Sequence, residues 1–521
     1  MDSLSSTTSI DKEKGFAGGT RVTPAAAAHP VLADVDEKDE DEGAHVAGYQ
    51  RNEYTQEEAD AVKRKLDRRV MPLLAAVYFS QFFDKNSLTY SSVMGLPIKG
   101  EQYNLVSMAF YLGFLCFEMP TTMISQRFPL AKYLGVNIII WATALILHAA
   151  SANFGFFFAM RFVLGIAESC VGPILINMVA SMYPKQQQAK RISIFYMCNG
   201  LTNMLGGIIA WGVTHYQGDG IAHWRIMYIL MGGLAYVVGI AVLLWLPDSL
   251  ASATFLSERE KVVAFERVRD NQTGNRNKVT KRYQVVEALT DPKTWGLLLL
   301  TALSSIPNGG LASFSSIIIK GFGYTSRETL LLQIPRGLIA ALTTITVCQL
   351  SDRLGTRMLP ILIAVIPTVI GAALLVVSSG GSKSMSLAGI FLAETYGSAL
   401  ALQYAWTASN TGGATKKSVV NGLFLSTFAL SNIIGTQIFR PNDAPSYTPG
   451  KIAILTLFAA MIPTVLMMYS WTQYLNRQKA AQLARLVEEN GWSPAEVDAQ
   501  RSRAAMEDKT DRENVFQTYL S

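Results

Sequence analysis

Seven charged side chains stand inside long apolar stretches of this 521-residue chain: Asp84, Lys85, Glu118, Arg161, Glu168, Arg336 and Glu394. A charge inside a membrane-spanning helix is costly, so by default it marks a transport path or a binding site. An arginine can hold an anionic group through its planar fork. A carboxyl group shielded from water could exchange a proton near neutral pH. The pattern predicts a protein that moves something polar across a membrane.

Arg161 and Glu168 lie seven residues apart in one of these stretches, with Gly165 between them. Seven residues are close to two helical turns, so both side chains should lie on one face, about 10 Å apart. The glycine would let another helix or a substrate approach. A site for an anion and a proton is one hypothesis, and a structural ion pair between helices is the other.

Asp84 and Lys85 are neighbours and cannot share a helix face, so each needs its own partner or water. A structural role with adjacent helices is again the alternative to lining a cavity. Glu118 precedes Pro120, where it could anchor a kinked helix or take a proton.

Uncharged polar side chains in the same stretches could line the path, among them Asn199, Asn308 and Gln403. Such residues often only join helices, which is the alternative at each position. The run Ile-Pro-Asn-Gly-Gly at 306–310 is expected to interrupt its helix. A break of this kind is tolerated in mid-membrane where the backbone lines a cavity.

These residues must be positioned by membrane-spanning helices, each of which needs about 20 apolar residues. Twelve helix-like stretches fall near residues 70–92, 103–125, 132–152, 154–180, 190–214, 224–246, 295–319, 329–350, 358–379, 385–409, 418–439 and 452–475. Six plus six around a hydrophilic stretch is the arrangement of transporters built from two halves. The sequence predicts an all-α membrane protein with twelve transmembrane helices in two six-helix halves.

Polar segments divide the chain further. The expected parts are a disordered tail (1–54), an N-terminal half (55–246), a central loop (247–293), a C-terminal half (294–475) and a C-terminal tail (476–521). Thr55 and Glu58 can form a capping box that starts an amphipathic surface helix before the first span. Lysine and arginine gather before the first span and in the central loop, which predicts that both termini are cytoplasmic.

Composition argues against other classes of protein. The chain is 50% hydrophobic and 16% charged with a net charge of +6, which suits a membrane surface and does not favour nucleic acid as a partner. Its five histidines never fall at metal-ligand spacing. Without a nucleophile–base or metal constellation, we predict that it is no enzyme and uses no cofactor or metal. The expected partners are the lipid bilayer and a small-molecule anion, and we expect a monomer.

A charged tight loop follows the eighth stretch and could pin two helix ends together; it contains Asp352, Arg353, Gly355 and Arg357. With the twelve stretches and Arg161, this loop resembles the major facilitator superfamily, in which it corresponds to a gating motif. The matching loop after the second stretch, residues 125–129, lacks the aspartate and glycine of that motif.

Within that superfamily the chain resembles the anion:cation symporters, specifically fungal allantoate permease-like transporters. The resemblance rests on residues 82–85, 118–120, 126–133, 161–168, 246–249, 306–310 and 510–514. It implies a multi-pass plasma-membrane permease of a fungus, driven by the proton gradient. The implied substrate is a small organic anion of the allantoate, ureidosuccinate, dipeptide or vitamin type, imported by alternating access.

The resemblance also implies roles for residues. Lys85 and Arg161 match substrate-binding positions, and Glu168 matches a proton-linked one. Asp84, Glu118 and Glu394 are further proton candidates, and the expected substrate site is completed by Asn199, Asn308, Arg336 and Gln403. Arg336 is the nearest replacement for a basic residue that some relatives carry in the seventh span. Two alternatives remain: an exporter of a fungal secondary metabolite, and a nutrient sensor that does not transport.

Overall fold

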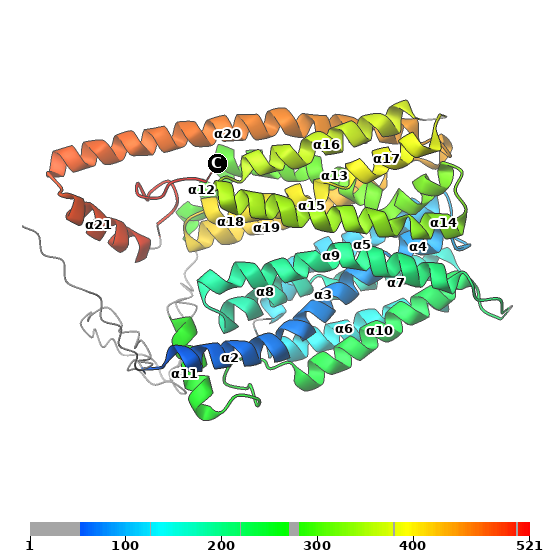
Figure 1. The fold of residues 1–521 in the computed structure, drawn as a ribbon, viewed down its shortest axis with the longest axis horizontal. Helices are drawn as coiled ribbons and strands as arrows, with labels where there is room; N and C mark the ends of the chain where they lie inside the picture. The colour runs from blue at the N-terminus through cyan, green and yellow to red at the C-terminus, as the bar shows by residue number, and fades with distance from the viewer. Residues whose placement is uncertain are drawn as a thin grey trace, which may run out of the picture.

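The structure is a computed structural model that describes residues 53–125, 127–218, 220–269, 281–378, 381–506 and 509–520. These residues form helices in two groups that lie side by side (Figure 1). The tail expected to be disordered, residues 1–54, lies outside the described residues except for Glu53 and Tyr54.

The first group, the N-terminal half, comprises α2 (Gln56–Arg69), α3 (Met71–Lys85), α4 (Ser87–Ser92), α5 (Glu101–Ser125), α6 (Leu130–Ala149), α7 (Phe154–Glu168), α8 (Val171–Met182), α9 (Lys185–Val213) and α10 (His223–Trp245). The segment between the halves contains α11 (Glu258–Arg269) and α12 (Arg282–Thr290).

The C-terminal half comprises α13 (Pro292–Gly321), α14 (Ser326–Leu331), α15 (Gln333–Leu354), α16 (Met358–Val377), α17 (Lys383–Ala393), α18 (Tyr396–Asn410), α19 (Ala414–Thr436), a 3₁₀ turn (Pro441–Asp443) and α20 (Thr448–Asn490). The last helix, α21 (Pro494–Met506), turns back beside the extension of α20 (Figure 1).

Ten helical segments of the described chain are long and apolar enough to cross a membrane. They match ten of the expected stretches, with α7–α8, α14–α15 and α17–α18 each forming one segment. The remaining two stretches correspond to α3–α4 and to α9, which pack in the same bundle. The predicted fold class, an all-α membrane protein in two helical halves, is confirmed, and twelve spans are consistent with it.

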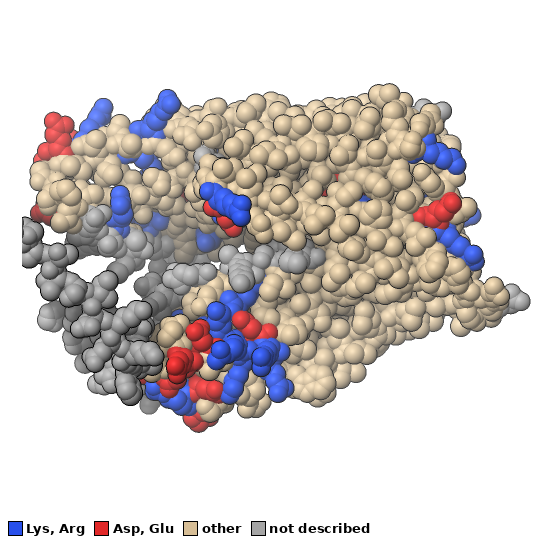
Figure 2. All heavy atoms as spheres, viewed as in Figure 1, with Lys and Arg blue, Asp and Glu red and all other residues tan. Residues whose placement is uncertain are grey.

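Charged side chains are unevenly distributed over the bundle. Lysine, arginine, aspartate and glutamate gather where α2, α11 and the end of α20 lie, which we call the charged end (Figure 2). Between this end and the opposite end, at α4 and α14, runs a belt with few charges on the visible face. Large apolar side chains are exposed on the spans, such as Val237, Leu244 and Val377. Such a surface suits lipid and not water.

At the charged end, α2 packs against α11. The capping box predicted at Thr55 and Glu58 is confirmed, since each bonds the other's backbone N–H. Glu58 also accepts hydrogen bonds from Arg259, and Lys65 pairs with Glu260. The amphipathic helix is thereby fastened to the central segment.

The helix interruptions differ from the expectation. The run 306–310 does not break its helix, because α13 continues through Pro307. Its glycines serve close packing instead: a Cβ on Gly309 would lie 2.4 Å from the carbonyl oxygen of Asn432 in α19. Breaks occur elsewhere, after Lys85, after Glu168 and at Glu394. Three of the charged candidates therefore stand at helix ends inside the bundle, where unpaired backbone groups and side chains can meet a ligand.

The two halves meet along α9 with α15 and α5 with α19. Gly200 and Gly337 bring the first pair together, since a Cβ on Gly337 would lie 2.7 Å from the carbonyl oxygen of Gly200. Hydrogen bonds join the halves at the opposite end. Tyr103 donates to the Ser313 carbonyl at 2.6 Å, and Asn104 donates to the Phe439 carbonyl at 2.8 Å.

Candidate functional site

A helix break in the first span forms one wall of the site. Helix α3 ends at Lys85 and α4 begins at Ser87, with Asn86 as the cap between them. The Asn86 amide donates to Asn203 of α9 at 2.9 Å, which holds the break in place. Asp84 is buried and Lys85 is half-buried. Because a lysine at a helix C-terminus interacts favourably with the helix dipole, this position suits a cation.

Helix α7 supplies Arg161, whose side chain crosses to that break. Its guanidinium donates to the Ser87 hydroxyl at 3.2 Å and to the Lys85 carbonyl at 3.3 Å. It also stacks over the Phe110 ring, 5.4 Å from the centroid. Its Nε is buried and has no hydrogen-bond partner among the described residues. A buried donor of this kind is costly unless a ligand or water satisfies it.

Lys85 lies among aromatic rings. Its ammonium is 5.2 Å from the centroid of Tyr111, 5.7 Å from that of Phe82 and 6.0 Å from that of Phe428 in the C-terminal half. Lys85 and Arg161 line one small cavity, whose walls include Ala312 and Ser313 of α13 across the interface. Two cations from the N-terminal half thus face a space between the halves, which suits an anion.

Asp84 and Glu168 form a carboxyl pair beside these cations. Asp84 is 1% exposed and Glu168 is fully buried. The two side chains lie near each other, and none of their four oxygens has a hydrogen-bond partner among the described residues. Two neighbouring buried carboxylates repel each other, and a proton on one of them would relieve that repulsion. The arrangement can therefore hold and release a proton.

Close packing of α5 and α7 positions this site. A Cβ on Gly165 would lie 2.0 Å from the Phe110 carbonyl oxygen, and one on Gly113 would lie 2.2 Å from the Phe162 carbonyl oxygen. Gly165 was expected to let another helix or a substrate approach, and the helix that approaches it is α5. This contact sets the distance of Arg161 from Phe110.

Arg336 and Glu394 pair with each other and do not line the cavity of Lys85. Arg336 forms a buried ion pair with Glu394 and donates to Ser315 at 2.5 Å and to Gln333 at 2.7 Å. Both were expected to act separately, as an anion clamp and a proton carrier. The structure gives each a protein partner instead, so neither is free in this conformation.

The remaining candidates are dispersed. Asn308 bonds Asn432 and Tyr396 within the C-terminal half, at 2.7 and 2.8 Å. Gln403 accepts from Ser304 at 3.1 Å, and its buried Nε2 has no partner among the described residues. Asn199 is exposed on α9.

Glu118 stands apart from the carboxyl pair. It is buried on α5 and interacts electrostatically with Tyr404 of α18, so it faces the other half of the protein. Its role as a proton carrier remains a prediction.

The charged loop after α15 closes as its residues suggested. Gly355 takes a left-handed conformation at φ 64°, which favours glycine. Arg357 then pairs with Asp352 at 2.7 Å and donates to Ser351 at 2.9 Å, while Arg353 is exposed. The loop pins the end of α15 to the start of α16. Its gating role remains a prediction.

Sequence reasoning missed several neighbours of the cations: Ser87, Phe110, Tyr111, Ser313 and Phe428. The sequence does not distinguish a serine or an aromatic residue that lines this cavity from one that packs elsewhere, because both kinds of position lie in helices of similar apolar composition. The asparagine of α9 that bonds the break between α3 and α4 is Asn203, whereas Asn199 was the one predicted to line the path.

Comparison with known proteins identifies the family. Residues 70–436 match the model of the Major Facilitator Superfamily. The chain belongs to this superfamily. It is 34% identical to the allantoate permease of Saccharomyces cerevisiae over 447 residues, covering 82% of each chain. It is also 34% identical to the thiamine pathway transporter THI73 of the same yeast, over 80% of this chain and 81% of that one.

Solved structures of the superfamily share the fold. A bacterial homolog of the human lysosomal transporter Spinster, in an inward-facing and unoccupied conformation, matches 85% of this chain and all of its own, with a TM-score of 0.58 and 14% identity. At this identity the likeness concerns the fold alone. The family and the relatives show a membrane-embedded transporter of a small molecule.

Proposed function

We propose that this chain is a proton-coupled importer of a small organic anion, working by alternating access of its two halves. The observation that carries the proposal is the pair of cations, Lys85 and Arg161, at one cavity between the halves. Arg161 Nε is an unused buried donor, and Lys85 is held by aromatic rings. A carboxylate placed between them would satisfy both.

Asp84 and Glu168 would carry the coupling proton. Arg161 donates to the Lys85 carbonyl beside Asp84, and a cation near a carboxyl group favours its ionised form. A substrate anion bound to Arg161 would weaken this effect and so favour proton uptake by the pair. Proton binding and anion binding would then support each other, which is the physical basis of symport.

The likeness to the allantoate permease supports a substrate of the allantoate or ureidosuccinate type. Arg336, the candidate for a second anion clamp, is neutralised by Glu394. A substrate with a single carboxylate therefore suits this site better than one with two. The lysines and arginines at the charged end support a cytoplasmic location for it, and a plasma-membrane location follows from the resemblance.

Transport into proteoliposomes would test the proposal. With purified full-length chain, labelled allantoate and an imposed pH gradient, we expect accumulation that depends on the gradient. Glu168→Gln mimics the protonated group, so it should still exchange substrate but lose accumulation. Glu101→Gln, at an exposed carboxylate at the start of α5, is the matched control and should behave as wild type. Reversing the gradient separates import from export.

Two results would contradict these roles. Accumulation by Glu168→Gln with normal pH dependence would move the coupling proton to another carboxyl group. Saturable uptake by Arg161→Ala at the wild-type rate would reduce that arginine to a structural role.

A further inference from the structure

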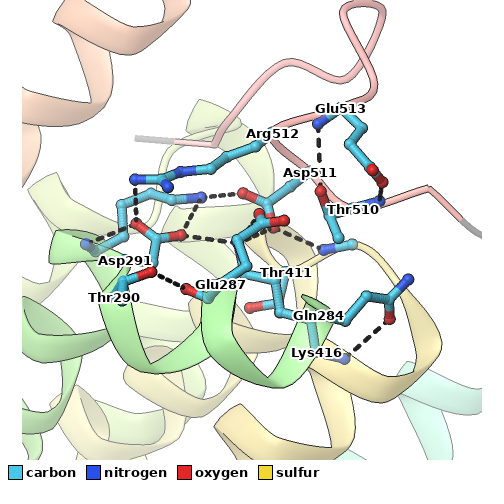
Figure 3. Close-up of polar contacts among 12 residues, drawn as sticks. Gln284, Glu287, Thr290, Asp291, Thr411, Lys416, Thr510, Asp511, Arg512 and Glu513 are labelled. Carbon is cyan, nitrogen blue, oxygen red and sulfur yellow. Dashed lines mark hydrogen bonds and ion pairs between the residues drawn. The ribbon is translucent and has the colours of Figure 1, made fainter. Parts of the chain in front are cut away.

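The chain returns to the bundle after α21. Residues Thr510–Leu520, which we call the C-terminal strap, lie against α13, α18 and α20 of the C-terminal half. Figure 3 shows the start of the strap, from Thr510 to Glu513, beside Asp291 and Glu287. Thr510 and Asp511 are fully buried, and Tyr519 is 5% exposed. A chain terminus is usually poorly ordered unless specific contacts hold it. The contacts here come from several helices.

Charge holds the start of the strap. The Asp511 carboxylate pairs with Lys293 of α13 and, at 2.8 Å, with Lys416 of α19. It also accepts a hydrogen bond from Tyr519 at 2.9 Å. Lys479 of α20 donates to three strap carbonyls, those of Asp511, Asn514 and Gln517.

Asp511 of the strap supplies the third carboxylate for three buried lysines. Lys293, Lys416 and Lys479 are all at least nine-tenths buried. Their carboxylate neighbours outside the strap are Glu287 and Asp291. Without Asp511, three ammonium groups would face two carboxylates, and Lys479 would lose three acceptors. Buried charge without a partner is strongly unfavourable, so this groove requires an acidic ligand.

A metal ion does not fit the same carboxylates. Glu287, Asp291 and Asp511 each offer an oxygen at metal-like spacing. However, the Lys416 ammonium lies 2.8 Å from each of them. The lysine therefore occupies the position that a cation would take.

Amide contacts hold the other end of the strap. The Asn410 side chain of α18 accepts from the Leu520 N–H and donates to the Leu520 carbonyl, both at 2.7 Å. Trp406 of α18 also donates to that carbonyl at 2.9 Å. Asn476 of α20 exchanges two bonds of 2.8 Å with the Tyr519 backbone. These paired bonds satisfy the backbone polar groups at the end of the strap.

We propose that the C-terminal strap is an intramolecular peptide ligand that ties the ends of α13, α18, α19 and α20 together, and that transport requires it to be docked. Alternating access moves each half largely as a rigid body. The strap adds contacts to four helices, of which α13 and α19 are already joined at this end by the Lys416–Asp291 pair, so it would help to keep them moving as one. The uptake measurement rests on the proposed transport function, whereas the measurement of strap docking does not.

Full-length chain would be compared with Asp511→Asn by hydrogen–deuterium exchange of the strap and by substrate uptake. In the wild type we expect slow exchange at Tyr519 and Leu520, whose N–H groups are bonded to Asn476 and Asn410. Asp511→Asn should speed this exchange by about tenfold or more, because it removes an ionic anchor. It should lower the maximal uptake rate several-fold with little change in KM, since the substrate site is untouched.

Arg512→Gln is the matched control within the strap. Arg512 is exposed and reaches Asp291 only at 3.9 Å, so exchange should change by less than about threefold. Asn476→Ala provides a second test without a buried charge and should loosen Tyr519 and Leu520 even if Asp511→Asn does not fold.

Fast strap exchange in the wild type would overturn the docking, whether or not the chain transports. Release of the strap at an unchanged uptake rate, in either variant, would overturn its role in transport. A wild type that protects the strap but transports none of the anions would instead count against the proposed function alone.

Discussion

The contact between α5 and α7 makes a strong prediction, because it leaves no space for a side chain. A Cβ on Gly165 would lie 2.0 Å from the Phe110 carbonyl oxygen and 3.0 Å from the Phe114 nitrogen. Both are backbone atoms, so no side-chain rotation can make room. Gly165→Ala must therefore push the two helices apart.

The size of the effect follows from these distances. A carbon approaches a carbonyl oxygen no closer than about 3.3 Å in ordinary contacts, so the backbones must separate by about 1 Å. Overpacking of this kind costs about 1–3 kcal/mol. Since the unfolding entropy is about 2.1 cal/mol/K per residue, each kcal/mol lowers the melting temperature of a chain of this length by about 1 °C. We expect a fall of about 1–3 °C, and less uptake because α7 carries Arg161 away from Ser87.

Thermal unfolding of the purified protein in detergent would measure the effect, with uptake per surface molecule as the second readout. Gly233→Ala in α10 is the matched control, since nothing lies within 4 Å of its added Cβ. Alanine is the better helix former by about 1 kcal/mol, so the control should unfold at the same or a higher temperature. A Gly165→Ala protein as stable as the control would refute the close contact.

Three further outcomes follow from the charged residues. Glu394→Gln should destabilise the protein by about 3–5 kcal/mol in thermal unfolding, because it leaves Arg336 charged and buried without its partner. The double variant Glu394→Gln with Arg336→Met should recover part of this stability, and no recovery would contradict the pairing. Burial raises the pKa of Asp511, but Lys293 and Lys416 outweigh it and hold the value at about 2. Since the free group titrates near 3.9, strap docking should be constant between about pH 5 and 7 and weaken as pH falls from about 4 towards 2; exchange protection that changes between pH 5 and 7, after correction for the intrinsic pH dependence of amide exchange, would argue against this ionic anchor. Asp67→Asn should loosen the start of α9, because Asp67 accepts two hydrogen bonds from Arg191 at 2.8 and 2.9 Å. Unchanged hydrogen exchange in residues 185–195 would contradict this prediction.

Much of this architecture could be predicted because membrane insertion depends on local composition. The cost of burying a charge or a bare backbone group depends on the residue and its neighbours in the same helix, so apolar length alone located the spans. The same reasoning marked Lys85, Arg161 and Glu168, since a charge in an apolar stretch is visible without any partner. The capping box at Thr55 was predictable for the same reason, as both of its members lie in one turn.

Helix breaks were harder to predict than helices. The proline and glycines at 306–310 suggested a break, but α13 passes through them because α19 packs against the glycines. The chain breaks instead after Lys85 and after Glu168. Whether a helix continues through a weak former depends on what packs beside it, and that is tertiary information.

The sequence by itself determined the class of the protein, its two halves and which charges lie within apolar stretches, because each depends on whether a short segment prefers lipid or water. Only the tertiary structure decided which charges neutralise one another. Arg336 pairs with Glu394 58 residues away, and Lys293 pairs with Asp511 218 residues away. A buried charge requires a partner but does not specify one, since any opposite charge within reach satisfies it. The folded chain fixes the partner. It therefore separates the cavity cations, which form no ion pair with the described residues, from the paired ones beneath the C-terminal strap.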